Sequence, residues 1–445
     1  MKTSNTFSII EHQAFSKEDL KEIFKEKAEG FYKELEDFAK NNENLLGFKN
    51  KNTLKAKNYV GIIQTKSGVL EILPKCTNLD SYKKEDSSSN HDKEKLRRCY
   101  ELDNISKNND FYEKDFKFNP KNLLINMLKT LKNSPFKKSQ ISSLQSSKIP
   151  LFEVFITMFL DEFDSVYKKG LMRSYLSCEE NRAFLKGKLL FNEHIKQNLI
   201  HKERFFTSSD EFVLDIAPNR LIKSTLNFLK SKTSLNKFRL IKAMQMLDEV
   251  EFSTNYEKDF TYKISRHFDY YENLLSWCKI FLQNQTFAPY KGKNEAFALL
   301  FPMEKLFEDY VAHMLKKANP TQNIKTQSSG KYLISKKGEK CFMLKPDLYI
   351  ENETILDTKW KIPDSNEDKK HGIAQSDLYQ MFAYACKFKI HDIKLIYPLC
   401  ERTMSLQNTI KELEFNANEH LAFLNDNSPL KTNIKVQVIF TPLPF

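Results

Sequence analysis

Two acidic residues and one lysine in the last third of the chain have the types and spacing of a hydrolytic metal site. Asp347 lies in the segment 345–350, which reads KPDLYI, and nine residues separate it from Asp357, which is followed by Thr358 and Lys359. Side chains alternate along a strand, so Asp357 and Lys359 should share one face, and a turn should bring Asp347 beside them. Carboxylate oxygens hold Mg²⁺ or Mn²⁺, and an adjacent lysine can orient or deprotonate water. This spacing predicts phosphodiester hydrolysis.

Two predicted helices flank this pair of strands and add candidate residues. A helix over 302–313 carries Glu308, which we expect as a further metal ligand or water acceptor. A helix over 375–388 carries Gln380 and Tyr384, whose i, i+4 spacing places them on one face, so they join the predicted catalytic set. The alternatives are a surface hairpin with solvated charges and the edge of an ordinary amphipathic helix.

The composition is that of a folded protein with a polyanionic partner. The 445 residues correspond to two or three domains, and 40% are hydrophobic, with 36 Phe. The net charge of +12 suits DNA, although a lysine-rich chain is also typical of an AT-rich genome. No secretory signal or membrane span is visible, so we expect a cytoplasmic protein without membrane contact. The sequence contains no CxxC, HExxH or GxSxG motif, which argues against zinc hydrolases and α/β-hydrolases.

Changes in periodicity divide the chain into three predicted domains of a multidomain α+β protein. Residues 1–118 contain a β-hairpin over 57–75 and a polar, flexible insertion near 80–117. Residues 119–290 have mostly helical apolar spacing and are expected to form a helical middle region. Residues 291–445 follow the order helix, hairpin, helix, strand, which indicates a C-terminal α/β domain.

Motifs spread over most of the chain resemble the McrC family, the nuclease subunit of the McrBC restriction systems and their LlaJI-type relatives. The matching segments are 61–64, 71–75, 170–171, 175, 187–189, 219–223, 303–311, 345–347, 356–361, 377–384 and 395–398. The pair Gln380 and Tyr384 after the DxK strand is similar to the RecB-like branch of PD-(D/E)xK nucleases. Residues 80–117 have no counterpart in the family pattern.

The resemblance implies a restriction-endonuclease-like PD-(D/E)xK domain and a two-protein machine. McrC subunits bind a ring of the McrB AAA+ GTPase, stimulate its GTP hydrolysis and cut DNA after translocation. The chain has no GxxxxGK[ST] motif, so a motor must be another chain. Because the candidate catalytic residues lie in the last third, we expect residues 1–118 to dock on the motor. Two alternatives remain: a non-catalytic assembly or GTPase-activating subunit, and a stand-alone DNA repair nuclease.

Overall fold

The computed structural model contains two compact units. It describes residues 6–76, 119–131, 135–138, 149–283, 297–328, 330–336, 339–363, 367–400, 403, 406, 412–415 and 434–444. The first unit comprises Met1–Lys137, Ser142–Leu151 and Thr286–Phe445, and the second comprises Lys138–Ile141 and Phe152–Gln285. The insertion expected near 80–117 lies outside the described residues. Among the helices that the structure describes, none is both long and apolar enough to cross a bilayer.

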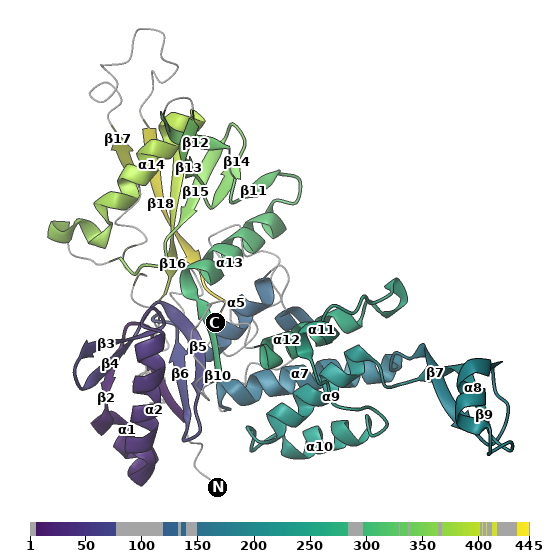
Figure 1. Ribbon diagram of the computed structural model, residues 1–445. Coiled ribbons are helices and arrows are strands. Elements are labelled where there is room, and N and C mark those ends of the chain that lie inside the picture. Colours follow the sequence, from purple (N-terminus) through teal and green to yellow (C-terminus); the bar gives the residue numbers. More distant parts are fainter. Residues whose placement is uncertain are drawn as a thin grey trace. The chain divides into compact units, whose positions relative to one another are not determined.

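A four-stranded sheet in the first unit joins N-terminal strands to a strand that lies more than 200 residues later in the sequence (Figure 1). Its order is β1 (Thr6–Ile10), β6 (Val69–Leu73), β5 (Tyr59–Gln64) and β10 (Phe297–Pro302). The β5–β6 hairpin agrees with the hairpin predicted from sequence, and β10 pairs antiparallel with β5. The close approach of β10 to β5 requires glycine at position 61. Gly61 has a φ of +134°, and a Cβ there would lie 2.0 Å from the carbonyl oxygen of Leu299.

The rest of the N-terminal part is a small sheet and a helical segment. The sheet has the order β2 (Ala14–Ser16), β4 (Thr53–Ala56) and β3 (Leu46–Asn50). The helices are α1 (Lys17–Phe24), η1 (Lys25–Lys27) and α2 (Ala28–Asn41). Ser16 begins α1, since its backbone N–H donates to the Asp19 carboxylate at 2.7 Å and closes a capping box. Phe31 and Leu35 of α2 are fully buried in the core that these elements share with β1, β5 and β6.

A six-stranded mixed sheet forms the C-terminal part of the first unit (Figure 1). Its order is β11 (Ile324–Thr326), β14 (Leu348–Ile350), β15 (Thr354–Thr358), β16 (Asp392–Leu399), β18 (Ile434–Pro442) and β17 (Glu412–Phe415). Strands β14 and β15 are antiparallel, whereas β15, β16 and β18 run parallel. The other elements of this unit are α5 (Pro120–Thr130), η2 (Pro135–Lys138), α13 (Met303–Ala318), β12 (Lys331–Lys336), β13 (Glu339–Leu344), η4 (Glu367–Gly372) and α14 (Gln375–Phe388).

Helices α13 and α14 cover opposite faces of β15. Ile355 belongs to the core that includes Met381 of α14. Trp360, two residues beyond the end of β15, packs instead on Phe307 of α13, with ring centroids 5.3 Å apart. The sheet between these helices therefore has two buried faces, and β15 lies inside it with neighbours on both edges.

The second unit is helical with one sheet. Its helices are α7 (Leu151–Lys169), α8 (Phe191–Asn198), α9 (Ala217–Lys230), α10 (Lys237–Gln245), α11 (Tyr256–Asp259), η3 (Arg266–Phe268) and α12 (Tyr271–Leu282). The first residue of α7, Leu151, belongs to the first unit. Strands β7 (Ser174–Arg182), β9 (Phe205–Val213) and β8 (Lys188–Leu189) form an antiparallel sheet, in a region expected to be helical. Most of β7 is exposed or half-exposed, so it lacks the apolar alternation that marks a strand in sequence.

One buried network ties the N-terminal strands to the segment that carries Lys359. Glu11 is 1% exposed, and its Oε1 accepts hydrogen bonds from the Trp360 indole N–H at 2.6 Å and the Lys75 backbone N–H at 3.1 Å. The Lys75 ammonium donates to the Trp360 carbonyl at 2.9 Å. This network and β10 connect residues 1–76 with the C-terminal sheet, and both belong to the first unit.

We expect Glu11→Ala to lower the free energy of unfolding by about 1–3 kcal/mol, because it leaves the Trp360 and Lys75 donors without their buried acceptor. Glu22→Ala, at an exposed position of α1, is the matched control and should change it by less than about 0.5 kcal/mol. Urea denaturation of the two full-length variants measures both values. Equal stabilities would show that the network does not hold the two parts together.

Candidate active site

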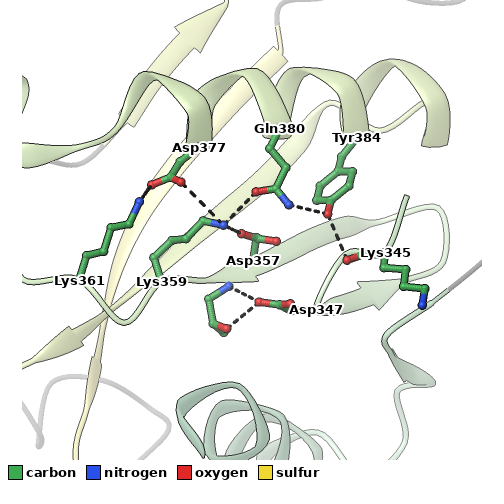
Figure 2. Close-up of polar contacts among 9 residues, drawn as sticks. Lys345, Asp347, Asp357, Lys359, Lys361, Asp377, Gln380 and Tyr384 are labelled. Carbon is green, nitrogen blue, oxygen red and sulfur yellow. Dashed lines mark hydrogen bonds and ion pairs between the residues drawn. The ribbon is translucent and has the colours of Figure 1, made fainter. Parts of the chain in front are cut away.

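The β14–β15 hairpin places Asp347 and Asp357 side by side (Figure 2). Leu348 pairs with Leu356, and the next position in this antiparallel register aligns Asp347 with Asp357. The turn between the strands includes Asn352 at a φ of +61°, a conformation that asparagine tolerates well. The Asp347 Oδ2 accepts hydrogen bonds from the backbone N–H and hydroxyl of Thr358, at 2.8 and 2.6 Å, and these fix its orientation.

Lys359 directs its ammonium at Asp357. Its Nζ lies 2.5 Å from the Asp357 Oδ2, and the Asp357 side chain is buried. The backbone N–H of Lys359 donates to the Ile396 carbonyl at 2.8 Å, which extends the β15–β16 pairing beyond the end of β15. The ammonium also donates to the Gln380 Oε1 at 2.9 Å. Two carboxylates and one ammonium thus meet at the end of one strand pair, as their spacing in the sequence indicates.

Gln380 and Tyr384 form a relay from Lys359 to the start of the hairpin (Figure 2). The Gln380 amide donates to the Tyr384 hydroxyl at 2.7 Å, and this hydroxyl donates to the Lys345 carbonyl at 3.1 Å. Both side chains lie on α14, one turn apart, as expected from their spacing. Their contacts are with the lysine and the backbone, so the geometry makes them positioning residues for Lys359.

Asp377 is a buried site residue that was not among the candidates. It lies on the first turn of α14, is 6% exposed, and its Oδ2 accepts from the Lys361 ammonium at 2.6 Å. Its Oδ1 lies 4.0 Å from the Lys359 Nζ. The sequence offered one signal for it: Asp377 precedes Gln380 by three residues and therefore lies on the same face of the helix.

Glu308 lies close enough to Asp347 for the charge of Asp347 to raise the pKa of Glu308. Its carboxylate, however, accepts hydrogen bonds from other side chains. Its Oε1 accepts from the Lys305 ammonium at 2.8 Å and from the Gln327 amide at 2.7 Å. Gln327 in turn donates its backbone N–H to the Asp347 carbonyl at 3.0 Å. Burial, and then the charge of Asp347, raise the pKa of Glu308. Its visible role is to support the Asp347 backbone, and a ligand role stays a prediction.

Burial and neighbouring charges shift the pKa values of Asp357, Lys359 and Tyr384. Burial, followed by the charge of Asp347, raises the pKa of Asp357 to about 7, although Lys359 opposes the shift. Burial alone would lower the pKa of Lys359, but Asp357, Asp377 and Asp347 outweigh it and raise that pKa. Lys359 is therefore a protonated, charged donor at neutral pH. Burial and the nearby Asp357 also raise the pKa of Tyr384 to about 12, so its hydroxyl stays protonated.

The donor set fits a hard divalent cation. Asp357 and Asp347 repel each other, as the raised pKa of Asp357 shows, and a cation between them would relieve this repulsion. Within the described part of the chain, no three acidic, histidine or cysteine side chains form a ligand cluster. Two carboxylates would suit Mg²⁺ or Mn²⁺, because such ions keep waters and substrate phosphates as their remaining ligands.

The raised pKa of Asp357 predicts a pH dependence in metal-free protein. Between the ordinary Asp pKa of about 4 and about 7, the folded chain binds a proton that the unfolded chain releases, so stability should fall as pH rises. Asp357→Asn removes this effect and should stabilise the protein more at pH 8 than at pH 5. Thermal unfolding in chelator measures the difference, with the half-exposed Asp392→Asn as control. A pH-independent difference would contradict the assigned shift.

Comparisons with known proteins agree with this architecture. A family model described as "McrBC 5-methylcytosine restriction system component" matches residues 54–398. The chain is similar in structure to a chain of the "Refined half-complex from tetradecameric assembly of Thermococcus gammatolerans McrB AAA+ hexamers with bound McrC", with a TM-score of 0.62 and 20% identity over 98% of this chain and 94% of that chain.

A second solved structure, "Cryo-EM structure of the Thermococcus gammatolerans McrBC complex", matches with a TM-score of 0.46 and 21% identity over 72% of this chain and 89% of that one. No curated protein sequence matches the chain. The family match covers more than half of the 445 residues and confirms the resemblance drawn from the sequence motifs. The chain belongs to the McrBC restriction system family, as an McrC-type member.

Proposed function

We propose that this chain is the endonuclease subunit of a GTP-dependent McrBC-type restriction complex, and that it cuts DNA in a PD-(D/E)xK domain of the restriction-endonuclease type. The observation that carries the proposal is the meeting of Asp347, Asp357 and Lys359 at the end of the β14–β15 hairpin. A stand-alone repair nuclease would need the same site but no motor. A non-catalytic subunit would have no reason to keep a buried carboxylate, Asp357, beside the half-buried carboxylate of Asp347 and a lysine.

The side chains divide the work of phosphodiester hydrolysis among them. A bound Mg²⁺ or Mn²⁺ would activate water and stabilise the charge that develops on the phosphorane. Asp347 and Asp357 supply its oxygen ligands. Lys359, which stays protonated, orients the attacking water and offsets negative charge at the scissile phosphate. Gln380 and Asp377 hold the lysine ammonium in this position.

We expect Asp357→Ala or Lys359→Ala to reduce DNA cleavage by at least about 100-fold while folding and partner binding persist. Each change removes a group from the site without opening the apolar core. Lys387→Ala, at an exposed position of α14, is the matched control and should cut normally. Cleavage of plasmid DNA by the full chain with its partner and GTP measures the effect. Cutting at the wild-type rate by either variant would contradict the assignment.

Cleavage should require Mg²⁺ or Mn²⁺, because the site offers carboxylate oxygens rather than thiolate or imidazole ligands. Excess EDTA should stop cutting, and either ion added back should restore it. Because a chelator also removes the Mg²⁺ of a GTPase partner, the partner's GTP hydrolysis is followed in the same samples. Sustained cleavage in excess chelator would exclude this mechanism.

A partner AAA+ ring needs a docking surface on this chain, and the second unit offers a candidate. The similar solved structure is titled as McrB AAA+ hexamers with bound McrC, which supports such a partner here. Docking through residues 1–118 stays a prediction; in their described part only Ile23 and Phe48 are exposed large apolar residues. In contrast, β7, β9, α8 and their connections expose nine: Tyr175, Leu176, Phe184, Leu185, Phe191, Ile195, Leu199, Ile200 and Phe212.

These side chains stand on a well-bonded framework, which we call the β7–β9 arm (residues 174–213). Asn181 and Asn198 exchange hydrogen bonds of 2.8 and 2.9 Å between β7 and the end of α8. Arg182 bonds Ser209 and Glu211 of β9, each at 2.7 Å. An ordered framework with so many exposed apolar side chains is typical of a protein-binding surface. The arm therefore joins residues 1–118 as a candidate contact with the ring.

We expect the double variant Leu199→Ser, Ile200→Ser to reduce stimulation of the partner's GTPase by at least about tenfold, because both side chains are more than 70% exposed and lose only intermolecular contacts. Phe238→Ser, 78% exposed on α10, is the control. GTP turnover is measured with full-length chains, since a fragment ending at 285 would lack β10 of the N-terminal sheet. If the arm variant stimulates normally and Ile23→Asp does not, docking lies in residues 1–118.

A further inference from the structure

The β12–β13 hairpin exposes apolar side chains immediately before the active site. Its strands pair from Lys331–Leu344 to Lys336–Glu339 as a sheet of their own, and three residues after β13 comes Asp347. Phe342 is 70% exposed, and Ile334, Met343 and Leu333 are 49%, 41% and 40% exposed. A two-stranded sheet is only marginally stable in water, so this exposure indicates that something else covers the hairpin in the working complex.

Phe342 is held in a strained backbone conformation that its surroundings do not explain. Its φ is +57°, which is an outlier for a bulky side chain, and the ladder of paired residues passes from Tyr332–Met343 to Ile334–Cys341 without it. Buried packing cannot account for the strain because the ring is mostly in solvent. The conformation turns a large aromatic side chain outward, as a group that contacts a ligand requires.

The charge of the hairpin indicates what covers it. Residues 331–345 contain five lysines and a single acidic residue, Glu339. Lys331, Lys340 and Lys345 are exposed, and among the described residues none of the three forms an ion pair; Lys340 lies over the Tyr332 ring, with Nζ 5.8 Å from its centroid. A surface that combines unpaired lysines with apolar side chains is complementary to a nucleic acid duplex, whose phosphates and base edges offer both kinds of contact.

The base of the hairpin is fixed to the active site. Leu344 packs against the core that α14 shares with the six-stranded sheet. The carbonyl of the next residue, Lys345, accepts the Tyr384 hydroxyl, which is part of the relay to Lys359. A duplex lying on the hairpin would therefore be held at a set position relative to Asp347 and Asp357.

We propose that the β12–β13 hairpin is a DNA-binding ribbon, in which Phe342 enters a groove of the duplex against the bases while Lys331 and Lys340 contact flanking phosphates. This inference rests on the proposed nuclease function and names how its substrate is held. A two-stranded ribbon is narrow enough to enter a groove, and apolar wedges between base steps are a known means of gripping DNA without reading much sequence. The hairpin thus supplies binding and the strands after it supply cutting.

The test is the affinity of the full chain for a short fluorescent duplex in EDTA, where cutting is absent. Phe342→Ala should weaken binding by about tenfold or more at fixed salt, whereas Phe342→Tyr keeps the ring and should bind nearly normally. The double variant Lys331→Ala, Lys340→Ala should lower the slope of log affinity against log salt by about 2, one phosphate contact per lysine. Phe238→Ala and Lys387→Ala are the matched controls.

The outcomes separate this inference from the nuclease assignment. Wild-type affinity and salt slope in both hairpin variants, or no binding of duplex by the wild-type chain, would overturn the DNA-binding ribbon. Loss of partner GTPase stimulation with unchanged DNA affinity would also overturn it, because the hairpin would then be a protein contact. Asp357→Ala is measured in parallel: if it binds and cuts like wild type while Phe342→Ala fails to bind, the nuclease assignment fails and the ribbon stands.

Discussion

The burial of Asp357 beside a second carboxylate, Asp347, is the electrostatic constraint that the C-terminal sheet has to satisfy. Asp357 is 2% exposed on a strand with neighbours on both edges, and its pKa is raised to about 7 by burial and by the charge of Asp347. Such a carboxylate destabilises the fold at neutral pH unless a cation compensates for it. Lys359 does so in part, at 2.5 Å, and a divalent ion would complete the compensation.

The elements around this pair act mainly to hold Lys359 and the strand that follows it. Gln380 and Asp377 approach the ammonium from α14. Just beyond, Trp360 is fixed by Glu11 and Lys75 from the N-terminal strands. A movement of those strands would thus reach the position after Lys359 through hydrogen bonds rather than through a flexible linker. This gives a physical route by which a bound partner would influence the cutting that we propose.

Local features of this fold were predictable from sequence because they depend on neighbouring residues. Turn chemistry and apolar runs marked the β5–β6 hairpin, and helical spacing marked α14, whose bounds Gln375–Phe388 match the expected helix. Strand alternation placed Asp357 and Lys359 together, and the structure has them in contact. Strands β13 and β14 are separate, and Pro346 between them lacks the N–H that a continuous ladder needs.

Features that depend on contacts between residues distant in the sequence could not be predicted from local sequence patterns. Nothing near Glu11 in sequence points to Trp360, its partner 349 residues away. The apolar run of β10 indicates a buried strand but not that its partner is β5. The β7–β9 arm was missed because its exposed strands lack alternation.

The most direct test of the central claim is a structure of the full chain with its partner, duplex DNA and Ca²⁺, which takes the same oxygen ligands as Mg²⁺. The account predicts an ion within about 2.3–2.6 Å of carboxylate oxygens of both Asp347 and Asp357, with a DNA phosphate among its other ligands and the Lys359 ammonium beside that phosphate. DNA bound elsewhere on the chain, with no ion between the two carboxylates, would contradict it.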